Sequence, residues 1–116
     1  MLITFCKSKI AHGRVTEAEL YYEGSIAVDE DLLKAVDIIP GEKVEVLNIN
    51  NGTRIETYAI AGKSGSGQIC LNGPAARCGM VGDPLVILSY ALIDRSEAKK
   101  YQTKIIYLDD RNKIKN

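Results

Sequence analysis

The sequence predicts a small, mainly β protein that folds as one domain over residues 1–116, with a few short helices. Three observations support this prediction. Short apolar segments alternate with turn dipeptides such as Pro40-Gly41 and Asn51-Gly52. A chain of 116 residues is long enough for one hydrophobic core and too short for two. A helix–turn–strand unit also occurs twice, which favours a barrel formed by duplication.

The two copies of this unit span Ala35–Val46 and Ala76–Ile87, which align at a constant offset of 41 residues. In each copy, a short helical segment leads into a glycine and an acidic residue, and then into an apolar strand. Glycine–acid turns are common before strands, so chance similarity is the alternative. A genuine repeat predicts two halves related by a pseudo-twofold axis.

The first half of the chain is expected to contain a strand over Leu2–Ile10 and an extended segment over Glu17–Val28, interrupted by Gly24-Ser25. Asp29 is the expected cap of a helix over residues 30–36, because its carboxylate can accept a hydrogen bond from the first turn. The acidic residues that follow it suit the positive end of the helix dipole.

A hairpin follows, with strands at Lys43–Ile49 and Thr53–Ala61 joined by Asn51-Gly52. The next segment, Gly62–Gly67, is expected to be a flexible loop. It contains Gly-Lys-Ser, but Thr57 occupies the position where a phosphate-binding loop has its first glycine, which excludes that motif.

Two strands at Gln68–Leu71 and Leu85–Ile93 are predicted next, followed by a helical segment at Ser96–Lys100. The last predicted strand is Lys104–Asp109. The residues after it are polar, so we expect a frayed tail.

Composition excludes several classes of function. Fifteen basic and fifteen acidic side chains give a net charge of zero, whereas proteins that bind nucleic acid usually carry a basic excess. No apolar segment approaches the roughly 20 residues that span a bilayer, and the N-terminus does not resemble a signal peptide, so we expect a cytoplasmic protein. Three cysteines and one histidine match no zinc-binding spacing, so we expect no metal.

The step Gly24-Ser25 carries the most informative chemistry. Gly-Ser is a common turn dipeptide, so a simple bend between strands is one interpretation. Glycine can also adopt backbone angles closed to other residues and so turn its carbonyl toward the Ser25 hydroxyl. Attack of that hydroxyl would move the acyl group from nitrogen to oxygen, and elimination and hydrolysis would leave a pyruvoyl group. The chain would then be cleaved into residues 1–24 and 25–116.

Other candidate residues lie at strand positions with alternating faces. Arg54 and Tyr58 share one face of the predicted return strand, where an arginine can bind a carboxylate and a tyrosine can donate a proton. Asn72-Gly73-Pro74-Ala75 forms a strand-to-helix junction whose small residues let a ligand approach the backbone. Lys9 is a third candidate. Each of these residues would otherwise be an ordinary surface or capping residue.

Together these motifs resemble the pyruvoyl-dependent aspartate 1-decarboxylase family. The resemblance runs from Lys9 to about Ser89 and rests on three segments in the same order, Tyr22–Ser25, Asn51–Ile60 and Asn72–Arg77 with Gly82-Asp83. It implies a double-psi β-barrel and a homotetramer with active sites between neighbouring subunits. It also implies conversion of L-aspartate into β-alanine and CO2 for the synthesis of pantothenate, a precursor of coenzyme A.

The resemblance assigns a role to each candidate residue. Ser25 becomes the pyruvoyl group that forms a Schiff base with the substrate, so neither pyridoxal phosphate nor a metal is needed. Tyr58 is similar to the family's proton donor, and Gly24 with Thr57 takes part in self-cleavage. The expected substrate-binding residues are Lys9, Arg54, Thr57, Asn72, Gly73, Pro74 and Ala75. Two cations suit the two carboxylates of aspartate.

One position departs from the family pattern, and three alternative functions remain open. The family often has a histidine directly after the Lys9-Ile10 pair, whereas this chain has Ala11 followed by His12. The alternatives are a pyruvoyl decarboxylase of another amino acid, a non-enzymatic β-barrel binding module in which Gly24-Ser25 is only a turn, and a DNA-binding barrel. Zero net charge disfavours the last.

Overall fold

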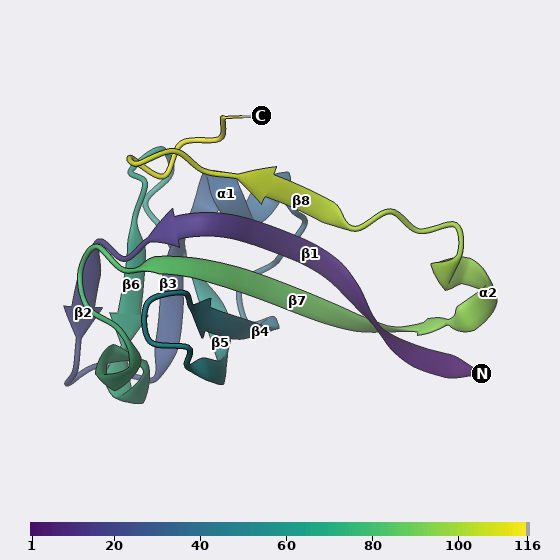
Figure 1. Cartoon of the computed structure of the whole chain (residues 1–116), viewed down its shortest axis with the longest axis horizontal. Coiled ribbons are helices and arrows are strands. Elements are labelled where there is room, and N and C mark those ends of the chain that lie inside the picture. Colours follow the sequence, from purple (N-terminus) through teal and green to yellow (C-terminus); the bar gives the residue numbers. More distant parts are fainter. Residues whose placement is uncertain (116) are drawn as a thin grey trace.

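The computed structural model describes residues 1–115 and contains one mixed sheet of eight strands in the order β2-β6-β3-β5-β4-β7-β1-β8 (Figure 1). Three short helices connect the strands. The bounds are β1 Leu2–Arg14, β2 Glu17–Glu19, β3 Ser25–Asp29, α1 Glu30–Ala35, β4 Lys43–Asn48, β5 Arg54–Gly62, β6 Ile69–Asn72, the 3-10 helix η1 Gly73–Cys78, β7 Pro84–Asp94, α2 Arg95–Ala98 and β8 Lys104–Tyr107.

The sheet closes into a barrel because β1 and β2 belong to one extended segment. β1 pairs with β7, and β2 pairs with β6 at the other end of the strand order. Between them, the backbone N–H of Val15 donates to Asp83 and that of Thr16 donates to Ile69. The joined β1–β2 segment and β3 to β7 therefore form a closed ring of six strands, and β8 extends the sheet beside β1.

The register confirms the internal repeat. β3 and β6 are antiparallel and place Val28 opposite Ile69, and β4 and β7 are antiparallel and place Val46 opposite Ile87. Both pairs are 41 residues apart, as a twofold axis between the copies requires. In addition, β3 runs parallel to β5 and β2 runs parallel to β6. A six-stranded barrel with this symmetry is the double-psi arrangement that the resemblance implied, so the predicted fold class is confirmed.

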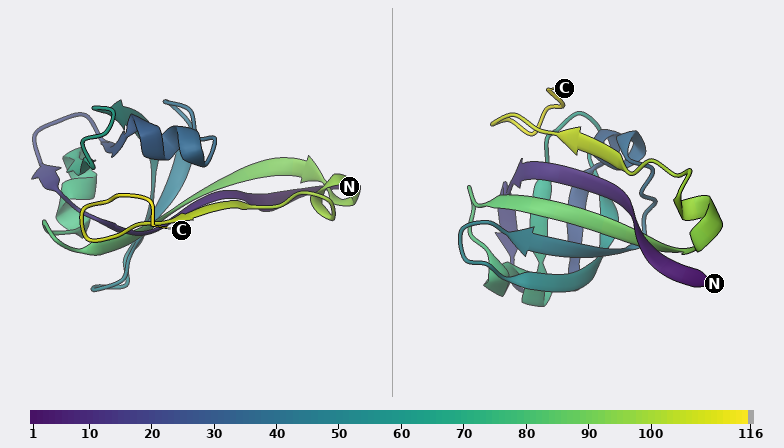
Figure 2. Two further views of the ribbon diagram at one scale, coloured as in Figure 1. Left: turned by 90° about the horizontal axis from the view of Figure 1, so that it is seen from above. Right: turned by 45° about the vertical axis from the view of Figure 1, so that its right-hand side comes forward.

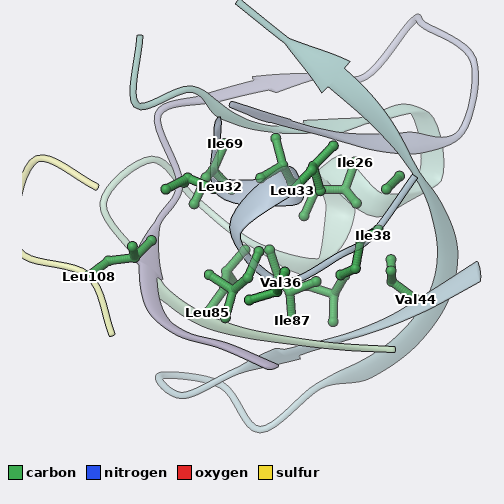
Figure 3. Packing of buried hydrophobic residues seen from close by; sticks show 14 of the residues in the cluster. Ile26, Leu32, Leu33, Val36, Ile38, Val44, Ile69, Leu85, Ile87 and Leu108 are labelled. Carbon is green, nitrogen blue, oxygen red and sulfur yellow. The ribbon is translucent and has the colours of Figure 1, made fainter. Parts of the chain in front are cut away.

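Buried aliphatic side chains from both halves fill the barrel (Figure 3). Helix α1 contributes Leu32, Leu33 and Val36 from its buried side and C-cap. These side chains lie near Ile26 of β3 and Ile87 of β7 in one cluster. The helices are short, and the strands supply most of the cluster, so burial of strand side chains accounts for most of the core's hydrophobic stabilisation.

The N-terminal part of β1 and the C-terminal part of β7 extend beyond the barrel as a two-stranded arm (Figure 2). Leu2 and Leu92 on this arm are largely exposed in the isolated chain. Among residues 1–115, none of the helices is long and apolar enough to cross a membrane.

Most predicted elements are confirmed within two residues, but two expectations are wrong. The extended segment from Glu17 ends at Glu19 and gives way to a turn, and a new strand starts at Ser25. The expected frayed tail is instead anchored by Asn112, which is buried. Its amide group donates to Arg14 O and Gly67 O and accepts from Arg14 N. Three backbone hydrogen bonds outweigh the polarity of the surrounding sequence.

Candidate active site

A groove of about 450 Å³ lies beside the Gly24–Ser25 peptide. Its walls come from β5, from helix η1 and from the residue that precedes β3. We call it the Gly24 groove; it is lined by Gly24, Ile55, Glu56, Thr57, Tyr58, Pro74, Ala75 and Cys78. Three segments that are far apart in the sequence, each singled out by the sequence analysis, therefore meet at one place.

Ser25 is the first residue of β3 and lies directly opposite Asn72 on β6. Its side chain is buried, with 1% of the residue's surface exposed. The Ser25 Oγ donates a hydrogen bond to Glu23 O at 3.2 Å and accepts one from Asn72 Nδ2, also at 3.2 Å. The hydroxyl is therefore held beside the peptide bond that joins it to Gly24.

Asn72 occupies the N-cap position of η1, but its side chain forms no capping hydrogen bond. The amide, which is 4% exposed, turns instead toward Ser25 Oγ and toward the thiol of Cys70. An ordinary capped helix was the alternative interpretation of this junction. The geometry contradicts it, because the side chain that would cap the helix donates a hydrogen bond to Ser25 Oγ instead.

The backbone requires glycine at position 73. Gly73 has a φ of 64°, in the left-handed region, and an added Cβ would lie 2.6 Å from Tyr22 O and 2.9 Å from Gly24 Cα. Any side chain here would push the Gly24–Ser25 segment away. The expectation that Gly24 itself uses such angles is wrong for this conformation, since its φ lies outside that region. Pro74 is the second residue of η1.

Strand β5 alternates as predicted. Arg54, Glu56 and Tyr58 are exposed, whereas Ile55 and Ala59 are turned to the core. Tyr58 and Thr57 both line the Gly24 groove. Tyr58 and Gly24 therefore line the same groove within a single chain.

The two predicted cations do not line this groove. Arg54 lies four residues before Tyr58, a distance of about 13 Å along a strand. Its guanidinium forms an ion pair with Glu45 at 2.7 Å. Lys9 lies in the middle of β1, not at the end of a strand as expected, and pairs with β7 and β8. Within a single chain, Lys9 and Arg54 therefore lie outside the groove beside Ser25.

His12 also lies elsewhere. It occupies a β-bulge of β1 with a φ of 67° and lines a different hollow with Arg14 and the C-terminal segment. Ala11, which stands where the family often has histidine, is buried in the strand. Neither residue lines the Gly24 groove.

The equivalent junction in the other half is organised differently. Asp29, 2% exposed, accepts hydrogen bonds from the backbone N–H groups of Asp31, Gly65 and Gly67. Burial alone would raise the pKa of this carboxyl, but the three N–H donors and the positive charge of Lys113 outweigh burial and hold the pKa below its usual value. Asp29 therefore caps α1, as predicted, and also anchors the loop after β5.

The sequence analysis did not single out Cys70. Its thiol is 3.2 Å from Asn72 Oδ1, and the residue is 3% exposed. Because residues two apart in a strand share a face, the position of Cys70 relative to Asn72 was a signal that could have identified it. Among residues 1–115, no three histidine, cysteine or acidic side chains gather as a metal site would require.

Comparison with known proteins agrees with these motifs. The profile of the aspartate decarboxylase family matches residues 1–115. The aspartate 1-decarboxylase of Thermoanaerobacter pseudethanolicus is 56% identical over 110 residues, which cover 95% of this chain and 94% of the relative. The enzyme of the same name from Acetivibrio thermocellus is 54% identical and covers 100% of this chain and 92% of its own length.

A more distant relative, the aspartate 1-decarboxylase of Leptospira biflexa, is 50% identical and covers 99% of this chain and 98% of its own length. Among solved structures, the rationally designed protein mkDPBB_sym_86 overlaps 68% of this chain and 91% of its own, at 18% identity and a TM-score of 0.49. The family profile and these relatives span nearly the whole sequence. The chain belongs to the aspartate decarboxylase family.

Proposed function

We propose that this chain cleaves itself between Gly24 and Ser25 and then decarboxylates L-aspartate to β-alanine. The observation that carries the proposal is the buried Ser25 hydroxyl, which is held by Asn72 at the edge of a groove that also contains Tyr58. A serine in an ordinary turn needs neither the amide donor nor the neighbouring phenol.

Self-cleavage proceeds in steps that use the chain's own atoms. The Ser25 Oγ attacks the Gly24 carbonyl carbon, the C–N bond breaks, and the hydroxyl proton passes to the nitrogen, which leaves an ester and an amine. Loss of the Ser25 Cα proton then expels the Gly24 carboxylate from Cβ and forms dehydroalanine. Tautomerisation to an imine and hydrolysis release ammonia. The products are residues 1–24 and a 25–116 chain that begins with a pyruvoyl group.

Asn72 and Thr57 support these steps. The Asn72 N–H bonds to Ser25 Oγ, the atom that loses a proton in the first step and departs with the Gly24 carboxylate in the second, so it stabilises charge at that atom. Thr57 lines the groove beside Gly24, and we assign its hydroxyl to the Gly24 carbonyl oxygen. Gly73 fits this chemistry because its missing side chain leaves room for the Gly24 backbone.

The residues of the Gly24 groove also fit a pyruvoyl group at position 25. Such a group would supply an electrophilic ketone for the substrate amine and a sink for the electron pair left when CO2 departs. No side chain of the twenty offers a comparable electrophile. Pro74 and Ala75 form a wall of the groove without charge, and the Tyr58 phenol supplies a proton to the substrate Cα.

Tyr58→Phe should therefore separate the two reactions. We expect self-cleavage to continue, since the phenol takes no part in it, and turnover of aspartate to fall by about 10²–10⁴-fold. A β-alanine assay on the fully cleaved variant measures the loss. Full activity in this variant would remove Tyr58 from the role of proton donor.

The substrate cations are assigned to a neighbouring copy of the chain, in a homotetramer with active sites between subunits. Support comes from the positions of Lys9 and Arg54 away from the Gly24 groove and from the exposed apolar arm. Oligomers that mix Ser25→Ala and Lys9→Ala chains should regain activity that neither variant has alone, because some sites combine an intact Ser25 with an intact Lys9. Activity no greater than that of the separate variants would contradict shared sites.

The direct test of function is Ser25→Ala. We expect an intact, folded chain with no decarboxylase activity, measured by denaturing mass analysis and a β-alanine assay. Two fragments from this variant would contradict Ser25 as the nucleophile. A panel of amino acids, run on the wild-type protein, distinguishes aspartate from other substrates: an amino acid without a second carboxylate would leave one cation of the assembled, substrate-filled site desolvated and unpaired, which costs about 1–3 kcal/mol.

A further inference from the structure

The strand face that carries Ser25 is an outer face of the barrel, yet it is buried. Ile26 and Val28 of β3 and Ile69 and Leu71 of β6 point into the core. The residues between them therefore point the opposite way. Four of these side chains form two directly opposed pairs, Ser25 with Asn72 and Ala27 with Cys70, and all four residues are buried.

Hydrogen bonds connect three of these four side chains in a row. The Cys70 thiol donates to Asn72 Oδ1 at 3.2 Å, and Asn72 Nδ2 donates to Ser25 Oγ at 3.2 Å. An asparagine amide can rotate by half a turn and exchange its oxygen and nitrogen, so a donor on one side decides which end faces the other side. A thiol that donates to Oδ1 directs the amide N–H toward Ser25.

We propose that Cys70 is a positioning residue for self-cleavage, which acts by fixing the orientation of the Asn72 amide. The inference rests on the proposed self-cleavage at Ser25 and adds a residue to it. Cys70 does not touch the reacting atoms in this structure. It acts on Ser25 only through Asn72.

The surroundings of Cys70 keep its thiol in the donor form. Burial raises the pKa of the thiol above its usual value, and the negative charges of Glu17 and Glu19 on the neighbouring strand raise it further. A protonated thiol can donate to an amide oxygen, whereas a thiolate would attract the N–H end of Asn72 and turn it away from Ser25.

The orientation matters because a reversed amide would present its oxygen to Ser25 Oγ. That oxygen could accept the hydroxyl proton but could not stabilise negative charge as the Cβ–Oγ bond breaks. Without a donor at position 70, Asn72 Oδ1 would also lose the hydrogen bond that the thiol supplies inside a buried site. Both effects slow maturation and leave the residues of the mature groove in place.

Four single variants test this role. Cys70→Ala and Cys70→Ser leave a similar space and differ in the donor, since only serine carries an O–H group. Cys70→Val fills the space and has no donor. Cys6→Ala is the matched control, because it removes a thiol from β1 that lies outside this row of hydrogen bonds.

The measurement is the rate at which freshly synthesised chain is converted to the 25–116 fragment. Each variant is made in a cell-free translation reaction, denatured at intervals and analysed by mass, and its melting temperature is recorded separately. We expect Cys70→Ala and Cys70→Val to mature about tenfold more slowly than wild type, Cys70→Ser to recover most of the rate, and Cys6→Ala to match wild type.

Two results would overturn the role of Cys70. Maturation of Cys70→Val at the wild-type rate would show that the donor is dispensable. Equal slowing of Cys70→Ser and Cys70→Ala, in step with their melting temperatures, would show that the thiol only fills space. If the wild-type chain itself stayed whole, the proposed function would fail first and the role with it. If the wild-type chain matures normally and one of the two results above is found, only the role of Cys70 is wrong and the proposed function stands.

Discussion

The two strand-to-helix junctions of this barrel occupy corresponding places in its two halves, yet they use their polar residue differently. At the end of β3, Asp29 caps α1 and binds the loop after β5 through three backbone N–H groups. At the end of β6, Asn72 leaves η1 uncapped and donates to Ser25 Oγ. The polar residue of the first junction stabilises the fold, whereas that of the second forms no cap and instead holds the Ser25 hydroxyl.

The turns that precede β4 and β7 show that the halves have not diverged everywhere. Glu42 accepts a hydrogen bond from the backbone N–H of Ile39, and Asp83 accepts one from that of Met80. These positions correspond at the 41-residue offset. The copies therefore keep the same turn geometry and differ at the strand-to-helix junction, where Asn72 contacts Ser25.

Asn72→Ala should give the largest effect. The donor to Ser25 Oγ is lost, so we expect self-cleavage to slow by about 10²-fold or more, as when a donor to a developing charge is removed. The melting temperature should stay near that of wild type, because Asn72 does not cap η1. Time courses of cleavage and thermal unfolding measure the two quantities. If the variant lost much of its stability but cleaved at the normal rate, Asn72 would stabilise the fold and would not assist cleavage, which contradicts this comparison of the junctions.

Asp29→Asn should do the opposite. The amide that replaces the carboxylate directs an N–H group toward backbone donors, so we expect the free energy of unfolding to fall by about 1–3 kcal/mol. Cleavage should continue, since the Asp29 carboxylate accepts its hydrogen bonds from Asp31, Gly65 and Gly67 and not from the Ser25 segment. Chemical denaturation of the two proteins measures the difference in stability. A variant as stable as wild type would show that these bonds contribute nothing.

The smallest effect concerns pH. The pKa of Asp29 is lower in the folded chain than in the unfolded chain, so its ionised form favours folding. That contribution is complete above the unfolded pKa of about 4 and is lost as pH falls through the folded pKa. The stability difference between wild type and Asp29→Asn should therefore be constant near neutral pH and narrow below about pH 4. A difference that widens in acid would contradict the lowered pKa.

Local pattern was enough to predict most of the fold. Alternation identified the strands, Asn51-Gly52 identified the hairpin, and the acidic residues after Asp29 identified the capped helix. The 41-residue repeat predicted the pseudo-twofold pairing because a duplicated segment keeps its own turn residues. Apart from the comparison of the two copies, the determining residues in each case lie within a few positions of one another.

The remaining features depend on contacts between distant segments. The need for glycine at 73 arises from the backbone of Tyr22 and Gly24, and the anchoring of Asn112 arises from Arg14 and Gly67. For the site, the motifs predicted that Ser25, Tyr58 and Asn72 belong together, but no spacing along the chain could show that Lys9 lies away from the groove. The position of Cys70, two residues before Asn72 on the same strand face, was a local signal that the sequence analysis did not use.

The mass of the purified wild-type protein under denaturing conditions tests the central claim most directly. We predict two species, residues 1–24 and residues 25–116, with the larger one lighter by one ammonia than a fragment that begins with serine. Reduction with borohydride in the presence of aspartate should add substrate-derived mass to the larger species alone. A single, unbroken chain in a preparation that converts aspartate to β-alanine would contradict the account.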